Sequence, residues 1–125
     1  MSYSTKGSAT SPNLDAIREA VEMVKKAHPQ IQIDGELQVD AALDPDAAKI
    51  QKSIAGSSVA GRANVLIFPS LDAGNIAYNL TQRLAKARAV GPILLGLEKP
   101  ASDLSRACSV DDVIDAVAVV SVMAQ

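Results

Sequence analysis

The chain has 125 residues, of which 48% are hydrophobic but only 2% aromatic, and its net charge is −2. This length fits one domain with a core of its own, and the aliphatic composition favours packed helices over an all-β sandwich. The charge argues against nucleic-acid binding through bulk positive charge. No apolar stretch approaches the ~20 residues of a membrane span. A single cysteine cannot form an internal disulfide, so we expect a cytoplasmic protein.

A helix near the N-terminus has the clearest local signals. Ser11 followed by Pro12 is typical of an N-cap with proline at the first helical position. Apolar residues then recur at spacings of three and four up to Ala27, and Pro29 ends the pattern. A short strand is expected before this helix, at residues 2–5.

The rest of the chain alternates between predicted strands and predicted helices. Alternating or continuous apolar runs indicate strands, whereas apolar residues spaced by three or four indicate helices. In chain order we expect a strand at 30–34, a helix at 36–54 interrupted near Asp44 and Pro45, a loop at 56–61, a strand at 64–68, a helix at 72–86, a strand at 89–96, an irregular segment at 97–108 and a helix at 110–123. This order predicts an α/β fold with a largely parallel sheet, whose ligands bind at the carboxyl ends of the strands.

The entry to the last helix carries the strongest chemical signal. Within a short stretch lie Ser105, Arg106, Cys108, Ser109, Asp111 and Asp112. An arginine fork suits a phosphate or carboxylate, and a helix N-terminus also suits an anion, so Arg106 is a candidate phosphate ligand. Structural alternatives stay open: Ser109 and Asp112 match a capping box, Arg106 could form a surface ion pair, and Cys108 could be a small buried residue.

Three other signals are weaker. Residues 5–8 (TKGS) have the composition of a phosphate loop but not its order or its strand–helix frame. The turn at 72–75 follows a predicted strand and precedes a helix, where either a ligand site or a simple helix start is expected. His28 is interpreted as a solvated charge at a helix terminus, and with no second histidine a metal site is not expected.

Four segments follow one another as they do in the phosphate acetyltransferases (phosphotransacetylases). They are STKGSA (4–9), DGELQVDAAL (34–43), NVLIFPSLDAGNIAYNLTQRLA (64–85) and GPILLGLEKPASDLSRACSVDDV (91–113). The resemblance covers nearly the whole chain. Because family members are much longer, and their upstream sequence builds the other wall of the active-site cleft, the chain resembles only the C-terminal part of the enzyme.

The resemblance implies a three-layer α/β/α fold with a mostly parallel sheet, as part of a two-lobe architecture like that of isocitrate and isopropylmalate dehydrogenases. Residues 1–98 are then an α/β part of the second lobe, and residues 99–125 carry the active-site segment and a helix that docks on the missing N-terminal lobe. The implied reaction is reversible transfer of an acetyl group between coenzyme A, a substrate, and inorganic phosphate. The implied enzyme is a cytoplasmic homodimer of acetate metabolism with no metal cofactor, and we expect this chain alone to be inactive.

The family's residue roles carry over to matching positions. Asp112 matches the general base for the coenzyme A thiol, and Arg106 matches the arginine that holds the phosphate of acetyl phosphate. Ser105 matches a serine that hydrogen-bonds at the reacting centre, and Cys108 matches a cysteine near the site that is not the nucleophile. Ala107 departs from the family's glycine, and its methyl group disfavours a positive φ. The alternatives are a phosphate butyryltransferase and a non-catalytic, acyltransferase-like regulatory module.

Overall fold

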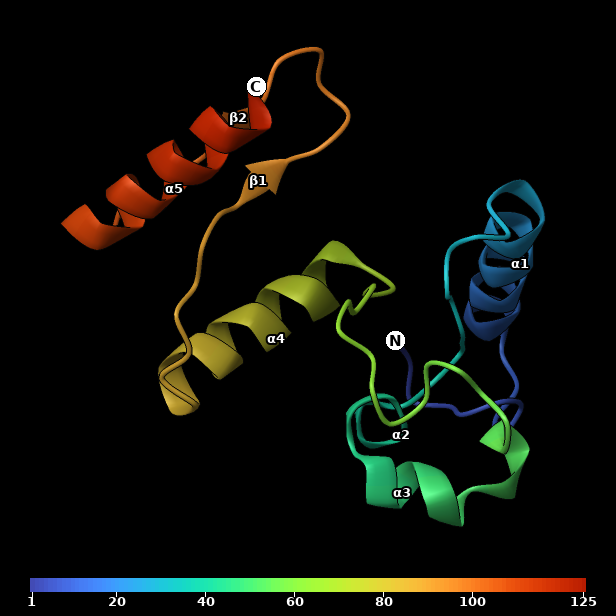
Figure 1. Cartoon of the computed structure of the whole chain (residues 1–125). Helices are drawn as coiled ribbons and strands as arrows, with labels where there is room; N and C mark the ends of the chain where they lie inside the picture. The colour runs from blue at the N-terminus through green and yellow to red at the C-terminus, as the bar shows by residue number, and fades with distance from the viewer. The chain divides into compact units, whose positions relative to one another are not determined.

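Helices are the main regular structure of the chain. The computed structural model describes residues 1–125, which form two compact units, Met1–Asn75 and Ile76–Gln125 (Figure 1). The elements in chain order are α1 (Pro12–Ala27), α2 (Val39–Leu43), α3 (Pro45–Ile50), the 3₁₀ helix η1 (Lys52–Ile54), α4 (Leu71–Leu84), β1 (Ile93–Leu94), β2 (Ala101–Ser102) and α5 (Val110–Met123). None of the helices has the length and apolar character that a membrane span requires.

Helix α1 confirms the strongest local prediction. The Ser11 side chain accepts a hydrogen bond from the backbone N–H of Leu14, and proline occupies the first helical position. At the other end, the backbone N–H of His28 donates to the carbonyl of Val24 at 2.8 Å. Leu14 and Val21 are the buried residues of this helix. Its boundaries therefore follow from capping, while two apolar side chains attach it to the rest of the first unit.

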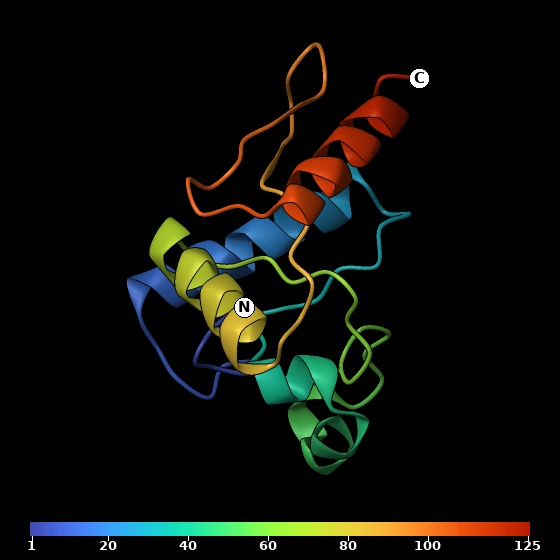
Figure 2. The ribbon, with the colours of Figure 1, turned by 90° about the vertical axis from the view of Figure 1, so that its left-hand side faces the viewer.

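The core of the first unit lies around α2 and α3. Its fully buried members are Leu37, Ala41, Ala42 and Ile54. The expected break in this region is confirmed: Asp44 ends α2 and caps α3, its side chain accepting from the backbone N–H of Asp46 at 2.8 Å. In both Figure 1 and Figure 2, the loop after α3 folds back beside it. This packing needs Gly61, because a Cβ there would lie 2.8 Å from the Cα of Pro45.

A buried polar network joins two motifs that are far apart in the sequence. The carboxylate of Glu36, only 1% exposed, accepts from the Ser4 hydroxyl at 2.9 Å and from the Gly7 backbone N–H at 2.8 Å. The Arg18 fork donates to both carboxylate oxygens at 2.9 Å. Hydrogen bonding from Arg18 is the main reason that the pKa of Glu36 falls from 4.5 to about 2.

A second set of contacts extends this network. Lys6 is paired with Asp34 and also donates to the carbonyl of Gly35 at 2.9 Å. The other carboxylate oxygen of Asp34 accepts from the Ser57 hydroxyl at 2.5 Å. These bonds explain what the TKGS segment does in this chain: the anions held by its backbone and side chains are the protein's own carboxylates, Glu36 and Asp34. The loop therefore has a structural role in this unit.

The strand predictions for the first unit are wrong. Residues 2–5, 30–34 and 64–68 form no assigned strand. At 2–5, the Ser2 N–H donates to the Leu37 carbonyl at 3.0 Å, but later N–H groups donate to local side chains: that of Ser4 to the Ser2 hydroxyl at 3.1 Å, and that of Thr5 to the Ser8 hydroxyl at 3.0 Å. At 64–68 no neighbouring strand pairs with the apolar run, so Val65 and Ile67 are 70% and 69% exposed.

The second unit contains the only sheet, an antiparallel pair in which Ile93 faces Ser102 and Leu94 faces Ala101. The expected largely parallel sheet is therefore not formed within this chain, and the strand predicted at 89–96 shrinks to two residues. Pro92 has no N–H to extend the ladder, and its carbonyl accepts instead from the Ser102 hydroxyl at 2.7 Å. Helix α5 contacts β2, and its buried residue is Ala116.

Candidate active site

The predicted site is built on a tight turn that leads directly into α5. The backbone N–H of Ala107 donates to the Ser105 hydroxyl at 3.3 Å, and that of Cys108 donates to the Ser105 carbonyl at 3.0 Å. Ser109 then caps the helix. The turn needs no positive φ at Ala107, because Lys6 and Lys86 are the chain's only non-glycine residues with one. The methyl group at 107 is therefore compatible with the local backbone.

Asp112 lies in the first turn of α5 and completes a capping box with Ser109. Its Oδ2 accepts from the Ser109 backbone N–H at 2.7 Å, and its own N–H donates to the Ser109 hydroxyl at 3.2 Å. The Ser109 backbone bond is the main reason that the pKa of Asp112 lies below its usual value, with Ser109's hydroxyl next. The capping interpretation is thus confirmed, and the other carboxylate oxygen, Oδ1, can still accept a hydrogen bond or a proton.

The other predicted site residues lie on the same turn. Ser105 and Arg106 are exposed, while Cys108 is half-buried with a free thiol. No ion pair of this chain involves Arg106, so the surface ion-pair interpretation is not realised. Local structure therefore brings a hydroxyl, a guanidinium and a carboxylate to one end of one helix.

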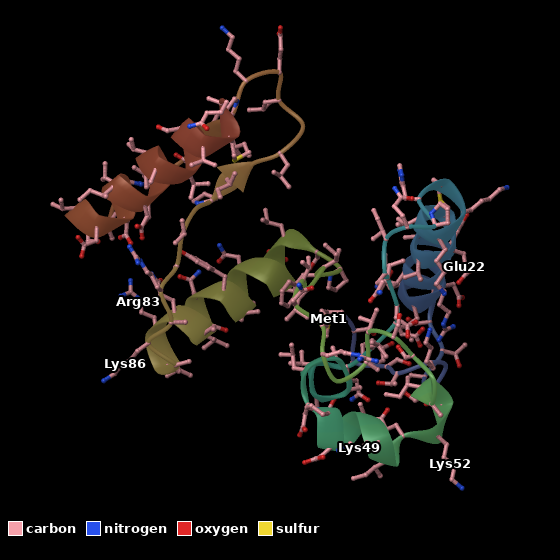
Figure 3. All side chains as sticks on the ribbon, viewed as in Figure 1. Met1, Glu22, Lys49, Lys52, Arg83 and Lys86 are labelled. Carbon is pink, nitrogen blue, oxygen red and sulfur yellow. The ribbon has the colours of Figure 1, made fainter.

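Two cations that sequence reasoning missed also act on this site. The charges of Arg83 and Arg88 both contribute to the lowered pKa of Asp112. Figure 3 shows Arg83 near the C-terminal end of α4, and Arg88 lies in the segment that follows. Arg88 is paired with Asp115, one turn beyond Asp112 on α5. No local spacing pattern could reveal these contacts, because 27 residues separate Arg88 from Asp115.

The weaker candidates at 72–75 and His28 lie at helix ends. Residues 72–75 are not a turn but the start of α4, where the Ser70 hydroxyl accepts from the Ala73 backbone N–H at 3.2 Å. Gly74 lies against Phe68, and a Cβ added at Gly74 would lie 3.6 Å from the Cβ of Phe68. His28 is exposed at the end of α1. The helix-start alternative is therefore the one that residues 72–75 realise.

An exposed guanidinium and hydroxyl can hold an anion, and a nearby carboxylate can accept a proton. These are two tasks of a site that transfers an acyl or phosphoryl group. The chain belongs to the family described as phosphate acetyl/butaryl transferase, whose sequence model matches residues 1–121.

Individual relatives agree with this assignment. The phosphate acetyltransferase of Acetivibrio thermocellus is 56% identical over 125 residues, covering 100% of this chain and 37% of the relative. The phosphate acetyltransferase of Clostridium acetobutylicum is 51% identical over 125 residues, which again cover 100% of this chain and 37% of the relative. The chain therefore spans little more than a third of the length of these curated relatives.

Solved structures show the same fold. A phosphotransacetylase from Streptococcus pyogenes superposes with a TM-score of 0.91 at 45% identity, covering 99% of this chain and 37% of that one. The EutD phosphotransacetylase from Staphylococcus aureus gives a TM-score of 0.82 at 43% identity, covering 98% and 37%. The chain thus shares the backbone course of part of a phosphotransacetylase.

Proposed function

We propose that this chain is part of a phosphate acetyltransferase, which transfers an acetyl group reversibly between coenzyme A and inorganic phosphate. The observation that carries the proposal is the junction before α5, where Ser105, Arg106 and Asp112 lie together in a chain whose relatives bear that name. The larger enzyme is proposed to have a three-layer α/β/α sheet within two lobes, and to act as a cytoplasmic homodimer in acetate metabolism.

The proposed reaction assigns one task to each group. Asp112 accepts the proton of the coenzyme A thiol, and the thiolate attacks the carbonyl carbon of acetyl phosphate. The new C–S bond forms as the C–O bond to phosphate breaks, so phosphate leaves with the electron pair. Arg106 holds the phosphate and offsets its growing charge, and Ser105 donates a hydrogen bond at the reacting centre. Cys108, half-buried beside them, is not the nucleophile.

Proton transfer to Asp112 is the costly part of this scheme. An ordinary aspartate and an ordinary thiol differ by about 4.6 pKa units, or roughly 6 kcal/mol. The capping bonds lower the pKa of Asp112 and so widen this gap. Cations must therefore lower the free energy of the thiolate and of the departing phosphate. Arg106 is the source on this chain, because the charges of Arg83 and Arg88 act on Asp112 itself and lower its pKa further.

Residues 1–98 are proposed to belong to the second lobe, and residues 99–125 to dock on the other lobe. Helix α5 supports the second part, because it is apolar on nearly every side. Val110, Ile114 and Val117 are 75%, 59% and 61% exposed in this chain. A helix that is apolar all round is normally buried. The position of this segment within its longer relatives, expected to be C-terminal, stays a prediction.

The decisive experiment compares the purified 125-residue chain with a protein of the family's full length that carries it. We expect acetyl-CoA formation from acetyl phosphate and coenzyme A in the longer protein and none in the chain alone. A longer protein that prefers butyryl substrates would support the butyryltransferase alternative. A longer protein with no acyl transfer would support the regulatory module and refute the proposal.

Substitutions in the longer protein then test the roles. Arg106→Ala should raise the KM for acetyl phosphate, whereas Arg62→Ala, a matched change at an exposed arginine, should not. Asp112→Asn keeps an oxygen that can cap the helix but cannot serve as a base, so kcat should fall by roughly 10²-fold or more. Unchanged turnover in Asp112→Asn would mean that Asp112 only caps α5.

A further inference from the structure

The second unit contains one ion pair, and it connects the segment before β1 to α5. Arg88 donates from Nε to Oδ2 of Asp115 at 2.7 Å, and its Nη2 pairs with Oδ1 of the same carboxylate. Both carboxylate oxygens are therefore engaged by one guanidinium fork. The Asp115 side chain is 14% exposed and that of Arg88 is 73% exposed. A two-pronged pair fixes orientation as well as distance, which a single contact to lysine does not.

This pair lies on the same helical face as the proposed base. Asp115 follows Asp112 by three residues, and residues at that spacing are neighbours on a helix surface. Figure 1 shows α5 beside β2, and these are the elements in contact within the unit. Only Ala116 of α5 is fully buried. Apolar packing therefore contributes little within this unit to fixing the first turns of α5, and the ion pair supplies a specific anchor.

We propose that Arg88 and Asp115 are positioning residues for acetyl transfer, holding the start of α5 so that Asp112 keeps its place relative to Arg106. This inference rests on the proposed function. Displacing a reacting group by about 1 Å can cost a large factor in rate. The pair touches no atom of the proposed reaction, so its effect passes through Asp112 and the turn before it.

The test uses the longer protein with Arg88→Lys, Asp115→Asn and the double variant. Lysine keeps the charge but loses the fork, and asparagine keeps the shape but loses the charge. Each single change should lower kcat roughly three- to tenfold while the KM for acetyl phosphate changes by less than about twofold. The double variant should lose no more than the worse single one, because both remove the same contact.

A second measurement does not depend on activity. Amide hydrogen exchange across residues 109–113 should be several-fold faster in Asp115→Asn than in the parent, because the helix start opens more often. Asp46→Asn is the matched control, because it breaks an exposed ion pair of 2.9 Å with Lys49 on α3. It should change neither the hydrogen exchange at residues 109–113 nor kcat. The side chains of Lys49, labelled in Figure 3, and Asp46 are 75% and 85% exposed.

The outcomes separate the two levels of inference. Unchanged exchange at 109–113, or losses in kcat that add in the double variant, would overturn the positioning role. A parent protein without acetyl transfer would instead refute the proposed function, and the exchange measurement would still test the anchor.

Discussion

Replacing Arg18 by methionine tests the buried network that joins the two N-terminal motifs. The substitution keeps an unbranched aliphatic side chain but removes four hydrogen bonds: two to Glu36, one to Asp15 at 2.9 Å and one to the Ala9 carbonyl at 3.1 Å. Glu36 would remain buried with only Ser4 and Gly7 as donors. A pKa lowered from 4.5 to about 2 corresponds to about 3 kcal/mol of stability at neutral pH, at 1.36 kcal/mol per unit. Arg18 is the largest of several contributors to this shift, and its removal also leaves a buried carboxylate without its cation, so we expect Arg18→Met to cost about 3 kcal/mol at pH 7.

The pH dependence of this loss identifies its origin. In the parent, the stabilisation from Glu36 is fully present above the unfolded pKa of 4.5 and disappears as the pH falls towards the folded pKa of about 2. At pH 3 the contribution is less than about half of its neutral value. The difference between variant and parent should therefore shrink from pH 7 to pH 3.

The assay is urea unfolding followed by circular dichroism at several pH values between these limits. Lys49→Met is the control, because its pair with Asp46 is exposed and should contribute less than about 1 kcal/mol at either pH. A loss in Arg18→Met that is equal at pH 3 and pH 7 would refute the assignment to Glu36. A loss below about 1 kcal/mol at pH 7 would show that the network stabilises the fold much less than its geometry implies.

Two further predictions concern backbone positions. Gly61→Ala places a Cβ 2.8 Å from the Cα of Pro45 at a φ of +76°, whereas Gly56→Ala has a similar φ of +86° and open space. Gly56→Ala should cost about 1 kcal/mol and Gly61→Ala clearly more, measured by urea unfolding, and equal costs would contradict the packing argument. Ser109→Ala should destabilise α5 by about 1 kcal/mol. It should also raise the pKa of Asp112 in an NMR titration, because the hydroxyl bond is lost while the larger effect of the backbone N–H bond stays, and an unmoved pKa would rule out a contribution from the Ser109 hydroxyl.

Local signals predicted the helices well. Ser11, Pro12 and Pro29 mark the limits of α1 to within one or two residues, and the break at Asp44 follows from its capping role. The same reasoning predicted the capping box at Ser109, which the structure contains. These features depend on residues within one helical turn of each other, so the sequence displays them directly.

Strands and distant contacts could not be read in the same way. The run at 64–68 has the composition of a buried strand, but a strand exists only where a neighbour accepts its backbone hydrogen bonds. Similarly, Glu36 and Ser4 are 32 residues apart, a separation that no local motif spans. The resemblance to the family includes both of their segments. Only the structure shows that the two segments are joined by hydrogen bonds.

The capping box and the proposed base compete for one carboxylate, and this competition constrains the mechanism. Oδ2 of Asp112 is committed to the Ser109 N–H, which orients the side chain and leaves Oδ1 to receive a proton. The same bond weakens Asp112 as a base by lowering its pKa. A carboxylate that is well placed but weakly basic can work only if the thiolate is stabilised as it forms. Catalysis then depends more on Arg106 than on the basicity of Asp112, so Arg106→Ala should lower kcat/KM by at least as large a factor as Asp112→Asn.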